Sequence, residues 1–162
     1  MVHLKSLTKL AHLSLHALPI GDDGLEHLKG LTNLVYLNLQ YTNVSDAGLV
    51  HIKFLTKLDF LIMNGSWVTD AGLEHLKGLA NLHQLHLSRT QVTDAGLVHL
   101  KDLTDLNILA LDRTRVSDAG LVHLKGLTQL QQLVLTGTKV TATGIAKLQE
   151  ALPNCAITWD GP

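Results

Sequence analysis

The chain has 162 residues and a formal net charge of −1 at pH 7. This length is sufficient for one ordinary domain with a hydrophobic core. The nearly neutral charge argues against a general nucleic-acid-binding protein, because such proteins are usually strongly basic. Aromatic residues make up only 4% of the chain while leucine is abundant, so we expect a core built mainly from one repeated aliphatic residue.

Membrane and secretion signals are absent from the sequence. No run of about 18 apolar residues exists that could span a bilayer, and the N-terminal stretch MVHLKSLTKL lacks the apolar segment of a secretory signal. These features favour the cytoplasm. The single cysteine, Cys155, excludes an intrachain disulfide framework and a cysteine-rich zinc site.

The chain repeats one pattern with a period of 24 residues. The segment LTNLVYLNLQYTNVSDAGLVHIKF begins at Leu31, and related segments begin at Leu7, Leu55, Leu79, Leu103 and Leu127. We therefore expect one domain in which residues 1–6 end a preceding repeat, residues 7–150 form six repeats and residues 151–162 form a C-terminal cap. Repeats of this length indicate a solenoid, in which each unit contacts its neighbours.

Within each repeat the apolar spacing changes along the chain. The alternation of Leu37 and Leu39 in LVYLNLQ predicts a strand of about three to five residues. A polar turn follows, and SDAGL predicts a short helix with Ser45 or Asp46 at its N-cap, where an acid is favoured by the helix dipole. A unit this small cannot bury its leucines alone, so stacking is expected to create a continuous core.

The pattern L-x-x-L-x-x-L-x-L-x-x-T-x-V-[ST]-D-A-G-L-x-x-L-K resembles the leucine-rich repeat family, most closely its ribonuclease-inhibitor-like, F-box-type and bacterial DAGL repeats. The resemblance implies an α/β solenoid, a right-handed superhelix with a parallel sheet on the concave face and short helices on the convex face. The usual turn asparagine of the family is replaced by hydroxyl residues, which we expect to serve the turn backbone. These residues are Thr42, Ser66, Thr90, Thr114 and Thr138.

Three other rows recur at fixed positions, and each has a chemical and an architectural interpretation. A metal array would need imidazoles converging on one ion, but neighbouring helices lie roughly 8 to 10 Å apart, so we interpret the histidine row as structural or solvent-facing. The aspartates are interpreted as helix-start residues, and the glycines as sites of tight packing where strand passes to helix. The rows are His3, His27, His51, His75, His99 and His123; Asp22, Asp46, Asp70, Asp94 and Asp118; and Gly24, Gly48, Gly72, Gly96, Gly120 and Gly144.

Function is expected where the repeats differ, on the strand positions that face outward. Neighbouring strands lie about 4.8 Å apart, so Tyr36, Phe60 and Ile62 should form one apolar cluster, and aromatic residues are enriched at interface hot spots. Arginines in later turns, with Asp112 close by, suit carboxylates or phosphates of a partner. The candidate partner-binding residues are Tyr36, Phe60, Ile62, Tyr41, Trp67, Gln84, His86, Arg89, Ile108, Asp112, Arg113 and Arg115.

The two ends of the chain differ. At the C-terminus, KLQEALPNCAITWDGP predicts a helix that runs to about Leu152 and a last strand containing Ile157 and Trp159. At the N-terminus, Leu7 and Leu10 belong to an ordinary repeat with no cap before it. This predicts either a fragment of a longer array or a pairing of that end, for instance with a second copy.

These features predict a non-enzymatic scaffold that binds a protein or peptide through its concave face, with no cofactor, metal, nucleic acid or membrane partner. No G-x-S-x-G, H-E-x-x-H or Walker-type motif is present. One alternative is a self-assembling or designed, near-consensus scaffold without a natural ligand. Another is a catalytic or metal-dependent role for the strand-face histidines, which are His12, His16, His83 and His86.

Overall fold

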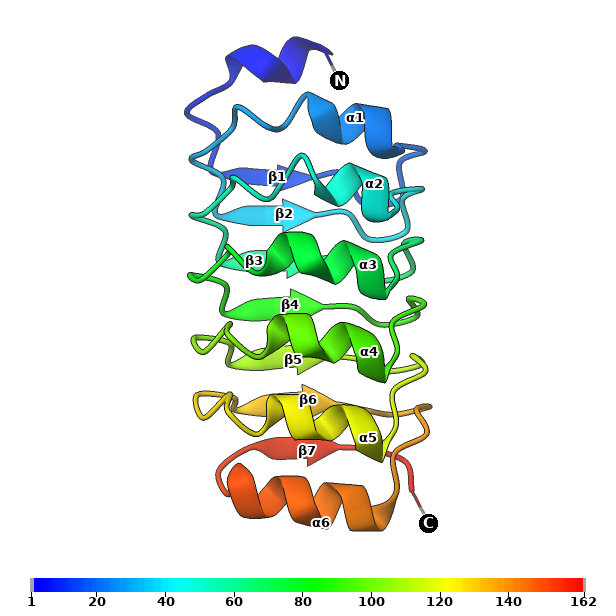
Figure 1. Cartoon of the computed structure of the whole chain (residues 1–162). Coiled ribbons are helices and arrows are strands. Elements are labelled where there is room, and N and C mark those ends of the chain that lie inside the picture. The colour runs from blue at the N-terminus through cyan, green and yellow to red at the C-terminus, as the bar shows by residue number, and fades with distance from the viewer. Residues whose placement is uncertain (1, 162) are drawn as a thin grey trace.

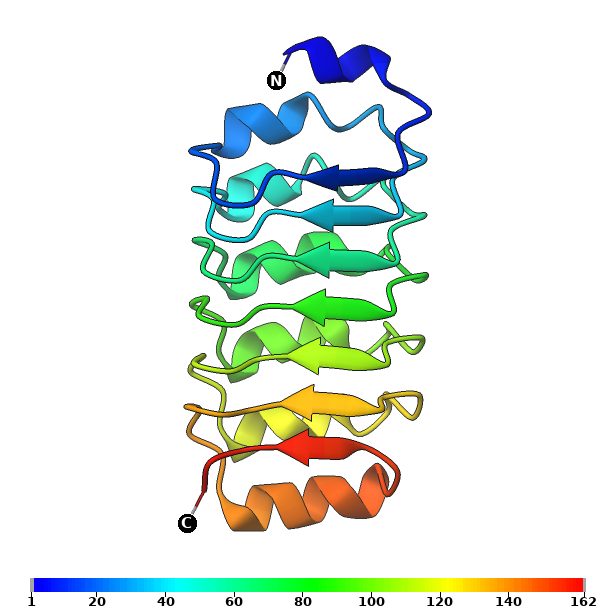
Figure 2. The same ribbon diagram turned by 180° about the vertical axis from the view of Figure 1, so that it is seen from behind.

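The structure is a computed structural model that describes residues 2–161. Seven parallel strands form one sheet in chain order, and the helices cover one face of that sheet (Figures 1 and 2). The strands are β1 (His12–Ser14), β2 (Tyr36–Asn38), β3 (Phe60–Ile62), β4 (Gln84–His86), β5 (Ile108–Ala110), β6 (Gln132–Val134) and β7 (Ala156–Thr158). The helices are α1 (Asp22–Glu26), α2 (Asp46–Leu49), α3 (Asp70–Leu73), α4 (Asp94–Leu97), α5 (Asp118–Leu121) and α6 (Ala142–Ala151). Short 3₁₀ helices span Val2–Ser6, Glu74–Leu76, Val98–Leu100 and Val122–Leu124.

The strands pair in a register that reproduces the sequence period. Leu13 pairs with Leu37, and Leu37 pairs with Leu61, so each strand residue lies beside the residue 24 positions further on. Each connection from strand through helix to the next parallel strand is right-handed (Figure 1). The predicted right-handed α/β solenoid with one parallel sheet is therefore confirmed.

The core is a continuous column of aliphatic side chains between sheet and helices. Leu31, Leu55 and the matching leucines of later repeats are fully buried, and Cys155 lies in the same core near Leu148. Burial raises the pKa of the Cys155 thiol, so this cysteine serves as an apolar core residue. In these respects the leucine pattern of the sequence predicts the interior directly.

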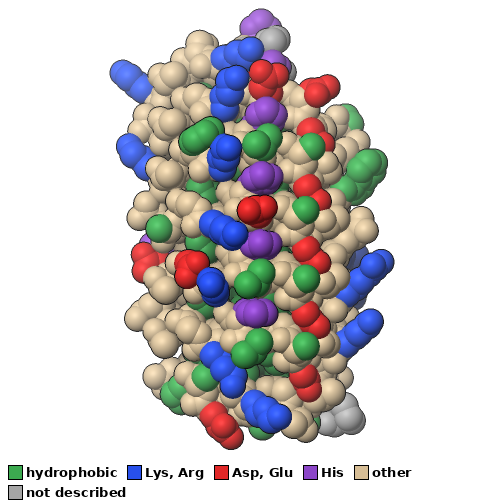
Figure 3. Space-filling view, viewed as in Figure 1, with side chains coloured by type: hydrophobic (Ala, Val, Ile, Leu, Met, Phe, Trp, Pro, Cys, Tyr) green, Lys and Arg blue, Asp and Glu red, His purple; other side chains and the backbone are tan. Residues whose placement is uncertain are grey.

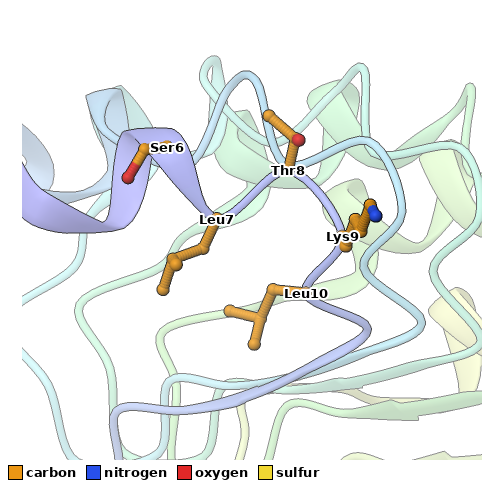
Figure 4. Close-up of a pocket in the computed structure, with 5 residues that line it drawn as sticks. All are labelled: Ser6, Leu7, Thr8, Lys9 and Leu10. Atoms are coloured by element: carbon orange, nitrogen blue, oxygen red, sulfur yellow. The ribbon is translucent and has the colours of Figure 1, made fainter.

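The two ends of the column differ in their covering. At the N-terminal end Leu7 is 47% exposed, and with Leu10 it lines a hollow of about 430 Å³ (Figure 4). The 3₁₀ helix Val2–Ser6 lies beyond α1 at that end (Figure 1), and its Leu4 packs against the core. At the other end, the predicted C-terminal helix and last strand are present as α6 and β7. Helix α6 ends at Ala151, and Trp159 lies directly after β7.

The hydroxyl row acts on the turn backbone as predicted. Thr42 Oγ1 donates a hydrogen bond of 2.7 Å to the carbonyl oxygen of Leu39, three residues earlier. The same bond recurs at Ser66, Thr90, Thr114 and Thr138. Each hydroxyl thereby satisfies a carbonyl at the turn that follows a strand, and all but Thr138 are buried.

The aspartate row lies at helix starts, as predicted: Asp22, Asp46, Asp70, Asp94 and Asp118 are the first residues of α1 to α5. In α2 to α5 the N-cap before the aspartate is a serine or threonine, as Thr93 is for α4. The carboxylate of Asp70 also binds the following repeat, accepting hydrogen bonds from Thr93 N–H at 2.7 Å and Thr93 Oγ1 at 2.6 Å. The prediction of a helix-start position is therefore confirmed, and the contact with the next repeat is a second role. Equivalent pairs are Asp22 with Ser45, Asp46 with Thr69, Asp94 with Ser117 and Asp118 with Thr141.

The glycine row leaves room for these carboxylates. A Cβ atom built on Gly96 would overlap Asp70 Oδ1 and would lie 3.1 Å from the Asp70 Cα. Because Oδ1 is held by Thr93, the carboxylate cannot move away without losing a hydrogen bond. The predicted close packing is confirmed at Gly48, Gly72, Gly96, Gly120 and Gly144, and its cause is the aspartate of the preceding repeat.

Replacing Gly96 with alanine should lower the free energy of unfolding by about 1 to 3 kcal/mol, since the added methyl group overpacks the contact with Asp70. Gly126→Ala is the matched control, because nothing lies within 4 Å of a Cβ at that position. Urea unfolding of both variants checks this. Equal stability of the two variants would show that the contact between repeats is not tight.

Candidate functional site

The turn that follows each strand places one residue in the left-handed backbone region. Ala17, Tyr41, Gly65, Arg89, Arg113 and Gly137 have φ between 54° and 67°. Glycine adopts this conformation freely, whereas other residues carry a steric cost of about 1 to 2 kcal/mol. Large side chains therefore project from a backbone position at which glycine would be less strained.

The aromatic residues of the strands lie side by side on the open face of the sheet, which we call the sheet face. Tyr36 and Phe60 are Cα partners in β2 and β3, and their ring centroids are 6.2 Å apart. Ile62 is on the same face and pairs with Asn38 and with His86 of β4. All of these side chains are half-buried, so each keeps part of its surface open to a partner.

A shallow depression of about 390 Å³, the sheet-face hollow, lies beside the aromatic pair. Of the predicted residues, it brings together Tyr41, His86, Arg89, Ile108 and Asp112. Tyr36, Phe60, Ile62, Gln84, Trp67, Arg113 and Arg115 do not line it. It also includes Gln40, Asn64, Ser88, Ala110, Gln132 and Val134. Those residues occupy the same variable strand positions as the candidates, which is the signal that could have identified them.

A polar network fixes the strand-end side of the hollow. The Ser88 hydroxyl donates to the Asp112 carboxylate, and Ser88 N–H donates to Asn64 Oδ1 at 2.9 Å. Arg89 N–H donates to the carbonyl oxygen of Asp112 at 2.9 Å. These bonds join three successive repeats, so the hollow has a defined polar wall before any ligand binds.

Burial lowers the pKa of His86 from its ordinary value of 6.5, and the nearby negative charge of Asp112 partly opposes this effect. The imidazole is therefore neutral at pH 7. A neutral imidazole has one donor and one acceptor nitrogen, which suits hydrogen bonding to a polar ligand group.

The edge beside the hollow carries exposed side chains of two kinds. Trp67 is 61% exposed, and its backbone N–H donates a hydrogen bond to the carbonyl oxygen of Val44. Arg89, Arg113 and Arg115 are exposed, and within residues 2–161 none has a carboxylate within 4 Å. The basic groups at this edge are therefore available to a partner.

Two of the strand-face histidines of the catalytic and metal alternatives have neighbours within the chain. His83 Nδ1 lies 2.7 Å from Asp59 Oδ1, and these two residues directly precede strands β4 and β3. The ring of His16 packs edge-on against the ring of Tyr41. In the part of the chain that the structure describes, no group of three His, Cys, Asp or Glu side chains could hold a metal ion. The helix-borne histidines form one column on the helix face (Figure 3).

Among the described residues, no helix is long and apolar enough to cross a membrane.

Comparison with known proteins supports the fold. A family model described as Leucine Rich repeat matches residues 30–53 and 78–101. Internalin C2 of Listeria monocytogenes has a similar structure, with a TM-score of 0.78, 25% identity, and coverage of 99% of this chain and 66% of that chain. The fold is that of a leucine-rich repeat solenoid, and two of its repeats match the family model. Leucine-rich repeat proteins are typically non-enzymatic scaffolds for protein interaction, and solenoids commonly bind through their extended surfaces.

Two further solved structures share this repeat fold at lower identity. The internalin inlF of Listeria monocytogenes gives a TM-score of 0.59 at 21% identity, and a plant peptide hormone receptor in complex with RGF2 gives 0.66 at 20%. The chain matches over 99% of its own length in both, but it covers only 58% and 26% of theirs. No curated protein sequence matches this leucine-rich repeat chain significantly.

The imidazole of His86 should titrate below pH 6.5, and Asp112→Asn should lower its pKa further, because the carboxylate favours the protonated form. NMR titration of the imidazole protons measures both values, with His86→Gln used to assign the signal. Since the unfolded chain binds this proton more readily, His86 should reduce stability as the pH falls through 6.5. If the pKa of His86 is unchanged in Asp112→Asn, the charge of Asp112 does not act on His86.

Proposed function

We propose that this leucine-rich repeat chain binds an extended protein segment or peptide through its sheet face. The contact surface comprises Tyr36, Phe60 and Ile62 together with the adjoining sheet-face hollow. The observation that carries the proposal is the pair of neighbouring, half-buried aromatic rings, Tyr36 and Phe60, beside a polar depression in a chain with only 4% aromatic residues. Tyrosine and tryptophan are enriched among residues that dominate binding energy.

The proposed surface is separate from the residues that hold the repeats together. The central strand leucine beside each aromatic residue, such as Leu37 or Leu61, is fully buried. Tyr36 and Phe60 face away from that core, and corresponding positions in later repeats hold Gln84 and Ile108. The fold thus accepts polar and aliphatic residues at this position, so the aromatic rings are not required for stacking.

The arrangement of polar groups favours binding over catalysis. A nucleophilic serine needs a base within hydrogen-bonding reach, but the Ser88 hydroxyl donates to Asp112 and makes no hydrogen bond with His86 among the described residues. The hollow is also shallow and open along the sheet. Its groups are suited to recognising amides and side chains of an extended ligand.

The fold itself is compatible with this role. A plant peptide hormone receptor with the same architecture was solved in complex with RGF2. At 20% identity this shows the shared fold alone, and the binding is a property of that receptor. It supports the proposal only by showing that the architecture occurs in a protein with a bound partner.

The double change Tyr36→Ala and Phe60→Ala should weaken binding of a sheet-face ligand by about 2 kcal/mol or more, because it removes both aromatic rings of the contact surface. Linear peptides selected from a random phage-displayed library on the wild-type chain provide the ligands, and fluorescence polarisation measures their affinities. Phe54→Ala is the control, since Phe54 is 60% exposed but follows helix α2 and lies outside the sheet.

Thermal melting of all variants by circular dichroism should give similar transitions, which separates binding from folding. The proposal is contradicted if the selected peptides bind the double variant as tightly as the wild type. It is also contradicted if exhaustive selection yields no peptide that distinguishes the double variant from Phe54→Ala.

A further inference from the structure

We infer that the turn edge beside the sheet-face hollow binds carboxylates, so that the bound segment is acidic at the end that lies over β4 to β6. This inference rests on the proposed sheet-face binding and specifies the chemistry of the ligand. The site, which we call the basic edge, consists of Arg89, Arg113, Arg115 and Lys139. Lys and Arg side chains protrude at the edge where the strands end (Figure 3).

Three consecutive repeats bring these cations together. Arg89 and Arg113 occupy the same turn position in successive repeats, directly after β4 and β5. Arg115 lies two residues further along its turn, and Lys139 occupies the matching position one repeat later. The backbone of Lys139 forms an isolated parallel β-bridge with that of Ser117. All four side chains are exposed, and none forms an ion pair within residues 2–161.

The neighbouring carboxylates are engaged elsewhere. Asp112 accepts the hydroxyl proton of Ser88, and Asp94 accepts from both the N–H and the hydroxyl of Ser117. Asp160 accepts the N–H of Gly137 at 2.8 Å. These acids stabilise the turns, so the basic edge keeps its hydrogen-bond donors for a ligand.

The backbone indicates that the two arginines are not present for folding. Both adopt a left-handed conformation, with φ of 58° at Arg89 and 56° at Arg113. Gly65 and Gly137 hold the same position in other repeats, with φ of 66° and 67°. Residues in strained backbone conformations cluster at binding sites, and a guanidinium group offers paired donors that match a carboxylate.

An acidic peptide fits this surface better than a nucleic acid does. The basic edge adjoins the sheet-face hollow, which Arg89 lines, and the whole chain has a net charge of −1. Proteins that bind nucleic acids through the phosphate backbone are usually strongly basic. Arg89 comes five residues after Gln84, the strand partner of Phe60. The basic edge is therefore offset from the aromatic pair by about 15 Å along the strands and about 5 to 10 Å across them, so an extended ligand needs about five residues between its apolar anchor and its first acid.

The first test compares peptide selections on the wild type and on Arg89→Gly/Arg113→Gly. Wild-type selections should be enriched in Asp and Glu about five positions from an aromatic or aliphatic residue, and the variant should lose this enrichment. Acidic peptides selected on the wild type should bind the variant about tenfold or more weakly, and added salt should weaken the wild-type complex. The variant should melt close to the wild type, because glycine is compatible with both turns.

Two further variants separate charge from flexibility. Arg89→Asn/Arg113→Asn should lose binding equally, since asparagine tolerates the left-handed conformation without the backbone freedom of glycine. Lys101→Gln/Lys125→Gln removes the same number of charges next to the 3₁₀ helices, away from the basic edge, and should keep wild-type affinity. A loss of binding in the lysine variant as large as in the arginine variants would contradict a localised site.

The outcomes distinguish the two proposals. Peptides that require Tyr36 and Phe60 but show no acidic enrichment, or bind Arg89→Gly/Arg113→Gly normally, overturn the basic edge and leave sheet-face binding intact. Acidic peptides that require the arginines but not Tyr36 and Phe60 support the basic edge and overturn the proposed aromatic contact. A single-stranded oligonucleotide that binds more tightly than every selected peptide overturns the assignment to an acidic peptide.

Discussion

Every repeat of this protein depends on its neighbours to bury its leucines, and that dependence fixes the spacing of all other features. A unit of 24 residues with a three-residue strand and a four-residue helix has too little interior of its own. Stacking solves this only when equivalent residues meet, as Leu37 and Leu61 do in adjacent strands. The aspartate pairs add a directional contact, because Asp70 binds Thr93 of the next repeat while Gly96 leaves room for it. Hydrophobic burial and polar contacts thus specify the same register.

This arrangement divides the molecule into surfaces under different constraints. The helix-start side is nearly invariant, because an aspartate, a hydroxyl residue and a glycine must meet at every junction between repeats. The sheet face has no such requirement, and the same strand position holds Tyr36, Phe60, Gln84 and Ile108. Variation is therefore concentrated where side chains are free of folding contacts. The same reasoning applies to the histidine column of the helix face, whose repetition indicates a role in the scaffold.

The sequence predicts the fold well because its main signal is periodic. Repeated leucines determine the strand register, and the hydroxyl at Thr42 and its equivalents has a local partner three residues away. Asp70 has an adequate local explanation at a helix start, so sequence alone does not reveal that its carboxylate binds Thr93. The sheet-face hollow was only partly predictable, since its shape depends on small side chains such as Ala110 in its lining. The left-handed turn position had a usable signal, because Gly65 and Gly137 share a column with Tyr41 and Arg89.

The left-handed turn position is occupied by glycine in some repeats and by a large side chain in others. Where glycine occurs, it also accommodates its neighbour: a Cβ at Gly65 would overlap the ring of Tyr41, and one at Gly137 would lie 3.1 Å from Arg113 Cγ. The glycines therefore leave room for the bulky residue of the preceding repeat. Tyr41 and Arg113 pack against these glycines and remain exposed. The turn edge thus combines backbone strain with packing that holds the strained side chains in place, which is the arrangement expected of a preorganised contact surface.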